Sequence, residues 1–178
     1  MFISEVFKGA PSDKRGDLET RAYNELKRLN IEFERVDNDE AISMEECVEI
    51  SNKLGAEIRK TVVVCNRQKT NYYLVVMPAD KRFDTKTFAH NMECARVSFA
   101  SEEDMLNILG VTHGNASVLA ILNDKDNIVQ VVLDKEVAKD EFFACNTGIC
   151  TTHIKMKTTD LINKFLDEEK HIPKIIEL

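Results

Sequence analysis

Three short segments of this 178-residue sequence carry residue types that could do chemistry. The first is Arg59-Lys60-Thr61, which lies where a polar stretch passes into an apolar, β-branched run. A lysine at the edge of a core can hold an anion or a carbonyl group, but its ammonium group can equally extend into water. Lys60 is therefore a candidate anchor for substrate, with a solvated lysine as the alternative.

The second segment is the loop Gly110 to Val118, and the third is Cys145-Asn146-Thr147-Gly148. Small residues in the loop allow backbone N–H groups to approach a ligand closely, as in an oxyanion hole, although an ordinary turn between two elements is the alternative. Cys145, Asn146 and His153 could form a thiol nucleophile with a base, but buried structural cysteines are the interpretation that we favour.

Signatures of the common enzyme classes are absent from the sequence. It contains no Gly-x-Ser-x-Gly elbow, no Walker phosphate loop and no His-Glu-x-x-His zinc helix. Its five cysteines include no C-x-x-C pair, which predicts reduced thiols and no zinc site. Asp124-x-Asp126 lacks the glycine and glutamate of a calcium loop. We expect neither a metal nor a cofactor.

The charge distribution bears on the kind of partner. A net charge of -7 argues against nucleic acid, because lysine and arginine supply most of the affinity for phosphates. The segment from Lys53 to Lys86, however, holds eight basic and three acidic residues, so it carries +5 and the remainder carries -12. This segment predicts either a basic face for one anionic partner or an ordinary solvated surface.

The elements that must position these residues can be read from periodicity and capping. Apolar residues at helical spacing predict a helix over 18–30, with Asp17 as N-cap, and Ser43-x-x-Glu46 begins another that ends before Gly55. Further helices are predicted over 85–91, 101–109 and 158–168. Strands are predicted over 31–36, 61–65, 72–77, 117–122, 128–133 and 151–156; 61–65 pairs with 72–77 as a hairpin, and 123–127 is the loop of a second.

This succession predicts one mixed α/β domain over residues 1–178. No apolar run approaches the roughly 20 residues needed to cross a bilayer, and the N-terminus lacks the layout of a signal peptide. We therefore expect a cytoplasmic protein without a membrane partner.

Taken in order along the chain, several segments resemble the YbaK and prolyl-tRNA editing domains. The resemblance includes Lys60-Thr61 before the hairpin, Met77 to Lys81 after it, Leu109 to Ser117, Leu122 to Asp124, 159–166 and Lys170 to Pro173. It implies a mostly antiparallel or barrel-like sheet surrounded by helices. It also implies hydrolysis, without a metal, of the ester that joins a wrong amino acid to tRNA.

The resemblance also assigns roles to residues. Lys60 matches the essential lysine, and Gly114, Asn115, Ala116 and Ser117 match the glycine loop whose backbone lines the amino-acid pocket. We expect Lys60, Gly114 and Ser117 to be catalytic. The expected substrate-binding residues are Thr61, Asn115, Ala116, Val118 and Asn146. The nucleophile would be water, assisted by the free hydroxyl of the terminal ribose.

Three positions depart from the family pattern: Thr61 replaces an asparagine, Val118 replaces a proline, and 146–150 replaces a His-Pro segment. The leading hypothesis is a monomeric trans-editing deacylase that clears alanine, or another small amino acid, from tRNA for proline, with prolyl-tRNA synthetase as a transient partner. The alternative is a non-catalytic module that binds aminoacyl-tRNA or a nucleotide. A cysteine-dependent enzyme using Cys145 is a third hypothesis.

Overall fold

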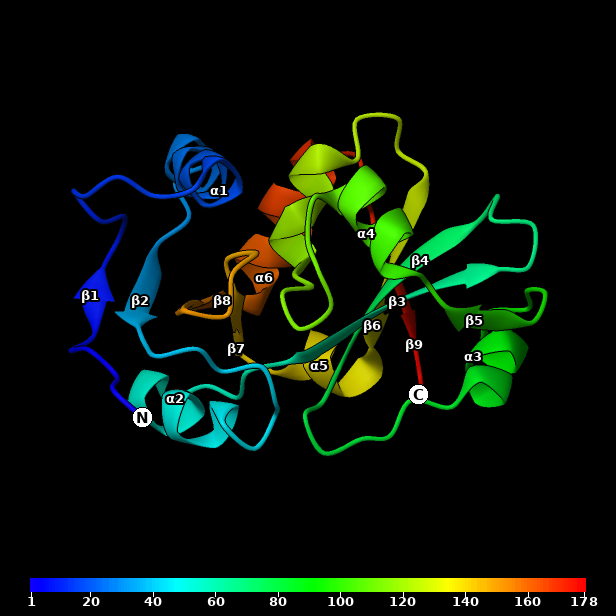
Figure 1. Ribbon diagram of the computed structural model, residues 1–178, viewed down its shortest axis with the longest axis horizontal. Helices are drawn as coiled ribbons and strands as arrows, with labels where there is room; N and C mark the ends of the chain where they lie inside the picture. The colour runs from blue at the N-terminus through cyan, green and yellow to red at the C-terminus, as the bar shows by residue number, and fades with distance from the viewer.

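The computed structural model describes residues 1–178 and contains two β-sheets with helices between and around them (Figure 1). The four-stranded sheet has the order β1-β2-β8-β7 and is antiparallel throughout; its strands are β1 (Phe7–Lys8), β2 (Phe33–Asp37), β8 (Thr152–Lys157) and β7 (Phe142–Asn146). The five-stranded sheet has the order β5-β3-β4-β6-β9; its strands are β5 (Val97–Phe99), β3 (Lys60–Asn66), β4 (Tyr72–Met77), β6 (Val129–Asp134) and β9 (Lys174–Ile176).

A single parallel bridge between Ile58 and Ala144 connects the two sheets. The mixed, mostly antiparallel α/β fold predicted from the sequence is confirmed, but the barrel-like alternative is wrong. The sheets remain separate because one bridge, rather than a continuous ladder, joins β7 to the chain entering β3.

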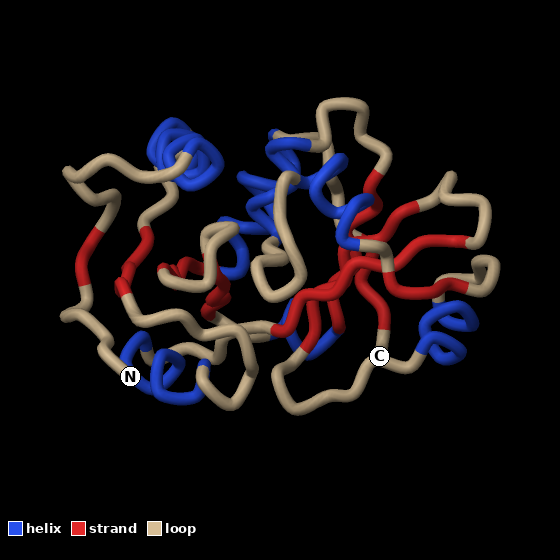
Figure 2. Tube along the Cα trace, in the orientation of Figure 1, coloured by secondary structure: helices blue, strands red, loops and turns tan.

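Helices fill the space between the sheets and cover their outer faces, as the tube in Figure 2 shows. They are α1 (Asp17–Arg28), α2 (Cys47–Leu54), α3 (Thr85–Asn91), α4 (Glu102–Leu109), the 3₁₀ helix η1 (Val118–Asn123), α5 (Lys135–Lys139), and α6 (Thr158–Asp160), which continues into the π-helical η2 (Leu161–Leu166). No helix combines the length and the apolar character that a membrane span requires.

Local capping explains where several helices begin and end. Ser43 and Glu46 form the predicted capping box one turn before α2, with reciprocal bonds of 3.2 and 2.8 Å to each other's backbone N–H. Gly55 ends α2 and Gly110 ends α4, each in the left-handed conformation. The prediction for α1 was wrong by one residue: Gly16 is the N-cap, and Asp17 instead pairs with Arg21.

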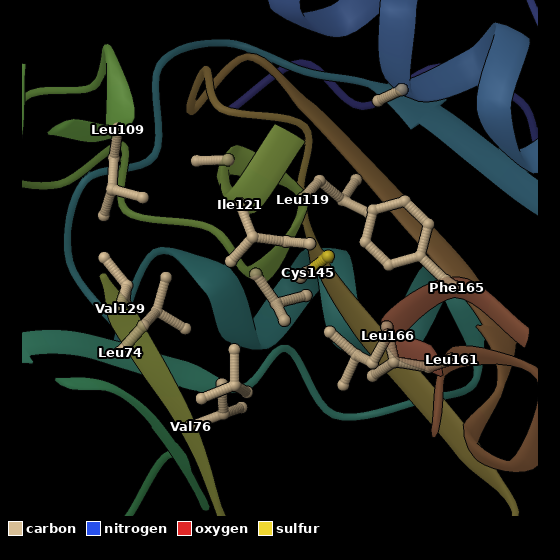
Figure 3. Close-up of a cluster of buried hydrophobic side chains, with 14 of the residues drawn as sticks. Leu74, Val76, Leu109, Leu119, Ile121, Val129, Cys145, Leu161, Phe165 and Leu166 are labelled. Atoms are coloured by element: carbon tan, nitrogen blue, oxygen red, sulfur yellow. The ribbon is translucent and has the colours of Figure 1, made fainter. Parts of the chain in front are cut away.

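The largest core cluster contains 29 buried residues and lies between the two sheets. Figure 3 shows Leu119 and Ile121 of η1 within it, together with Cys145 of β7 and Leu161, Phe165 and Leu166 of η2. Because residues 118–121 of η1 are all buried, this apolar run has no polar face to indicate the period of a helix.

The predicted second hairpin is therefore wrong. Residues 118–123 are helical rather than extended, and β6 pairs in parallel with β4. The Asp124 carboxylate redirects the chain, because it accepts hydrogen bonds from the backbone N–H groups of Ile128 and Val129 at 3.1 and 2.8 Å. The sequence prediction also missed β7, which provides one wall of the candidate site.

Candidate functional site

The loop of residues 111–117 leaves the left-handed end of α4 and passes close to the segment between β2 and α2 (Figure 1). Gly114 has φ +84°, and a Cβ atom at this position would lie 2.8 Å from Cγ2 of Ile42. A glycine is required here for both reasons: the backbone conformation and the close approach of Ile42. The backbone conformation of the predicted glycine loop is therefore constrained at Gly114.

Asn115 and Asn146 connect this loop to the segment of residues 146–150 that follows β7. The Asn115 side chain accepts a hydrogen bond from the Cys150 backbone N–H at 2.7 Å and donates to the Thr112 hydroxyl at 2.8 Å. Asn146 donates to the Ala116 carbonyl at 3.1 Å and accepts from the Gly148 N–H at 2.8 Å. The structure therefore brings together two segments that the sequence presented separately.

Ser117 lies beneath the loop and is completely buried. Its hydroxyl donates to the Asn146 carbonyl at 2.7 Å and accepts from the Leu119 N–H at 3.2 Å, which makes it the N-cap of η1. Val118 is also fully buried and packs in the core behind the loop. These two side chains support the loop from its inner side.

The backbone of the loop retains unused hydrogen-bond donors. The N–H groups of Gly114, Ala116 and Ser117 donate to no acceptor of the protein, whereas Asn115 N–H bonds to the Thr112 carbonyl at 3.1 Å. Gly114 is exposed and Ala116 is half-buried, so these two donors lie at or near the surface, whereas Ser117 is completely buried. Such an arrangement can bind a carbonyl oxygen or an oxyanion.

Lys60 begins β3, opposite Met77 of β4, and is half-buried. Its ammonium group donates a hydrogen bond to the Lys81 backbone carbonyl. In the parallel bridge between Ile58 and Ala144, Ile58 lies two residues before Lys60 and Ala144 lies two residues before Asn146. Lys60 and Asn146 thus follow the same junction, although no hydrogen bond or ion pair joins Lys60 to residues 114–117.

Thr61 is the next residue of β3 and is also half-buried. Because side chains alternate along a strand, it lies on the face of the sheet opposite that of Lys60. The structure therefore gathers Gly114, Asn115, Ala116 and Asn146 at one place. Lys60 does not contact this group and bonds to the Lys81 carbonyl instead.

The basic segment between Lys53 and Lys86 is not a single free face. Four of its eight basic residues pair with carboxylates: Lys53 with Glu5, Arg59 with Glu57 and Asp140, Lys69 with Asp104, and Lys81 with Asp134 and Glu136. These four residues therefore do not contribute to a free basic face, and Arg59 is buried rather than solvated. Lys60 keeps a neutral carbonyl as its partner.

Cys145 and His153 do not form a nucleophile and a base. Burial raises the pKa of the Cys145 thiol to about 12, and burial lowers the pKa of the His153 imidazole to about 4. Cys145 packs in the main core, whereas Nδ1 of His153 lies 2.9 Å from the side-chain oxygen of Asn38. The structure therefore favours the interpretation of Cys145 as a structural cysteine.

The sequence interpretation missed two exposed apolar side chains around the loop. Ile42 is 59% exposed and contacts the site of Gly114, while Ile149, between Gly148 and Cys150, is 42% exposed. The segment carrying Ile42 is fixed by Glu46, whose carboxylate accepts from the Ile42 N–H at 2.9 Å. The capping box was visible in the sequence, but its position beside Gly114 was not.

Comparison with known proteins identifies the family. The model of the aminoacyl-tRNA editing domain matches residues 39–164, more than half of the chain. The prolyl-tRNA editing protein ProX of Acetoanaerobium sticklandii is 26% identical over 162 residues, which cover 91% of this chain and 98% of the relative. Prolyl-tRNA synthetase associated domain-containing protein 1 of Danio rerio is 28% identical over 169 residues, which cover 94% of this chain and 89% of the relative.

Solved structures share the fold at low sequence identity. The structure of a proposed trans-editing enzyme for prolyl tRNA synthetase superposes with a TM-score of 0.67 at 13% identity, covering 93% of this chain and 98% of its own. Hypothetical protein APE2540 superposes with a TM-score of 0.67 at 15% identity, covering 89% of this chain and 98% of its own. The chain therefore belongs to the aminoacyl-tRNA editing domain family, a group of aminoacyl-tRNA deacylases, which hydrolyse the ester bond between an amino acid and tRNA.

Proposed function

We propose that this protein acts in trans on mischarged tRNA and removes a small amino acid, with alanine on tRNA for proline as the leading substrate. The reaction would be carried out at the 114–117 loop with Lys60. The observation that carries this proposal is the pair of backbone N–H groups at Gly114 and Ala116, which have no acceptor within the protein and lie at or near the surface. Two segments held together by Asn115 and Asn146 fix the positions of these donors.

Ester hydrolysis needs donors at the place where negative charge develops. In the tetrahedral intermediate, the former carbonyl oxygen becomes an oxyanion, and fixed N–H groups stabilise it more than they stabilise the ester. The Asn146 bonds to Ala116 and Gly148 hold the loop in place before substrate arrives, so little reorganisation is required. The loop thus has the properties expected of an oxyanion site.

Lys60 would add a positive charge to this region. Its partner is the neutral Lys81 carbonyl rather than a carboxylate, so its charge is not cancelled by a neighbouring anion. In a half-buried position, such a charge interacts more strongly with an anion than it would in bulk water. Lys60 would hold the terminal adenosine or the ester region of the substrate.

The nucleophile in this proposal is water, helped by the free hydroxyl of the terminal ribose. The Ser117 hydroxyl is completely buried and already donates to the Asn146 carbonyl, so it supports the loop and does not attack the ester. Cys145 is equally inaccessible, because the thiol lies in the core. Water and the ribose hydroxyl are the remaining oxygen nucleophiles that the substrate complex itself supplies.

Selection of a small amino acid would follow from sterics. Ile42 packs against the Gly114 backbone, so the loop has little room to move away from a bulky side chain. Excluding a larger side chain by contact is easier than rejecting a smaller one by lost contacts. We further propose that the chain acts as one domain, as a monomer in the cytoplasm, and meets prolyl-tRNA synthetase only transiently.

A deacylation assay tests the proposal. Purified protein is incubated with tRNA for proline carrying alanine, and with tRNAs carrying larger amino acids, and the rate of ester loss is measured. We expect Lys60→Ala to lower kcat/KM by about 100-fold or more, the range found when one stabilising group of an oxyanion site is removed. Lys86→Ala, which changes an exposed lysine of the same basic segment, is the matched control.

Two outcomes contradict this assignment. Activity that Lys60→Ala leaves unchanged would remove Lys60 from the site. Wild-type protein that binds aminoacyl-tRNA and never hydrolyses it would instead identify the non-catalytic binding module.

A further inference from the structure

One cavity of the protein lies away from the 114–117 loop. It has a volume of about 900 Å³ and opens between the end of α1, the start of β2 and the end of β8. Its floor is apolar and includes Tyr23, Phe33 and Met156. Its rim carries five lysines and three carboxylates, in a protein whose net charge is -7.

The ion pairs show which lysines remain free. Lys155 pairs with Glu34, and Lys164 pairs with Asp160 at 3.1 Å. The other three, Lys8, Lys27 and Lys157, are exposed and form no ion pair, and Glu32 is the one remaining carboxylate. The unpaired groups give the cavity rim a positive excess. Such an excess favours an anionic partner that offers several charges at once.

The position of the cavity relative to the candidate site restricts that partner. Helix α1 begins beside the site, because Leu18 is the neighbour that a Cβ on Gly148 would meet at 2.6 Å. Its 12 residues end at the cavity, which Lys27 lines, and they span about 18 Å at the usual helical rise. His153 of β8 pairs with Asn146 of the candidate site, and Lys157 at the end of β8 lines the cavity. The four residue steps between them span about 13 Å.

A nucleic acid strand has the charge spacing that fits this separation. Each strand of a duplex carries one phosphate per roughly 3.4 Å of helix axis, so 13 to 18 Å corresponds to about four or five phosphates. We infer that the cavity bordered by Lys8, Lys27 and Lys157 binds the phosphodiester backbone of tRNA, a few nucleotides from the aminoacyl end held at the 114–117 loop. This inference rests on the proposed function, because it takes the loop as the place where the aminoacyl end binds.

Direct binding of deacylated tRNA tests the inference without using catalysis. The dissociation constant is measured by fluorescence anisotropy at several salt concentrations for the wild type and for a Lys8→Ala, Lys27→Ala, Lys157→Ala triple variant. Loss of three phosphate contacts should lower the slope of log affinity against log salt by about 2 to 3, and weaken binding about tenfold or more at moderate salt.

The matched control removes three lysines that are equally exposed, form no ion pair and lie outside the cavity: Lys86, Lys125 and Lys174. Both triple variants should unfold at the same urea concentration as the wild type, because surface lysines contribute little to stability. Alanine esterified to a terminal adenosine alone lacks the distant phosphates, so the cavity variant should hydrolyse it as fast as the wild type.

The outcomes separate the two proposals. If the wild type binds tRNA and the two triple variants bind equally well with the same salt slope, the cavity inference is wrong and the proposed function stands. If the wild type hydrolyses no aminoacyl ester in the parallel assay, the proposed function fails. A cavity-specific loss of tRNA binding would still support the docking surface in that case.

Discussion

Replacing Gly114 by alanine tests whether the shape of the 114–117 loop determines catalysis. Two costs follow from the structure. The φ of +84° disfavours a residue with a Cβ, which costs about 1 to 2 kcal/mol in the left-handed region. The added Cβ would also meet Cγ2 of Ile42 at 2.8 Å, whereas carbon atoms pack at about 3.5 to 4.0 Å. Ile42 or the loop must therefore shift by about 1 Å.

Gly55 provides a matched control. It has φ +66° at the end of α2, and a Cβ there would meet nothing within 4 Å. Gly55→Ala thus carries the backbone cost without the contact. We expect Gly55→Ala to lose about 1 to 2 kcal/mol in the free energy of urea unfolding, and Gly114→Ala to lose at least as much because of the added contact. Only Gly114→Ala should lose deacylation, by about 100-fold, because a 1 Å displacement of the groups that bind the transition state has that effect.

The contribution of Ile42 can be separated by a double variant. Truncating Ile42 to alanine relieves the contact, so Gly114→Ala combined with Ile42→Ala should recover part of the lost activity, while Ile42→Ala alone measures the effect of the truncation. The reasoning is refuted if Gly114→Ala remains fully active, or if Gly55→Ala, which lies outside the loop, loses activity to the same degree.

Three other side chains give further predictions. Ser117→Ala should reduce the free energy of unfolding by about 1 to 3 kcal/mol, since it leaves the Asn146 carbonyl without its partner. The folded variant should keep measurable deacylation. Complete inactivity would contradict a supporting role for Ser117. Iodoacetamide should leave Cys145 unmodified in the folded protein, because burial raises the pKa of the thiol to about 12, and mass spectrometry of native and urea-treated samples checks this. Burial lowers the pKa of His153 to about 4, so between pH 6.5 and 4 the unfolded state binds more protons than the folded state. The free energy of unfolding should therefore fall by up to about 3 kcal/mol as the pH drops through this range. Urea unfolding at pH 7 and 4.5 should show a smaller difference for His153→Gln than for the wild type.

Elements stabilised by neighbouring residues were predictable from the sequence. The capping box at Ser43 and Glu46 and the C-terminal glycines of α2 and α4 each depend on contacts within one helical turn. The hairpin of β3 and β4 was also predicted, because its two β-branched and aromatic runs are adjacent along the chain. The residues proposed for the site came from the family resemblance, and their roles stay predictions.

Tertiary structure alone decided how the candidate site is assembled. Asn146 bonds to Ala116 across 30 residues, Cys150 bonds to Asn115 across 35, and Gly114 meets Ile42 from a different part of the chain. No local signal encodes such pairings, because they form only when the sheets and η1 pack together. The same reason accounts for the wrong second hairpin: the apolar run 118–121 is buried on all sides, so its composition is compatible with either a strand or a helix.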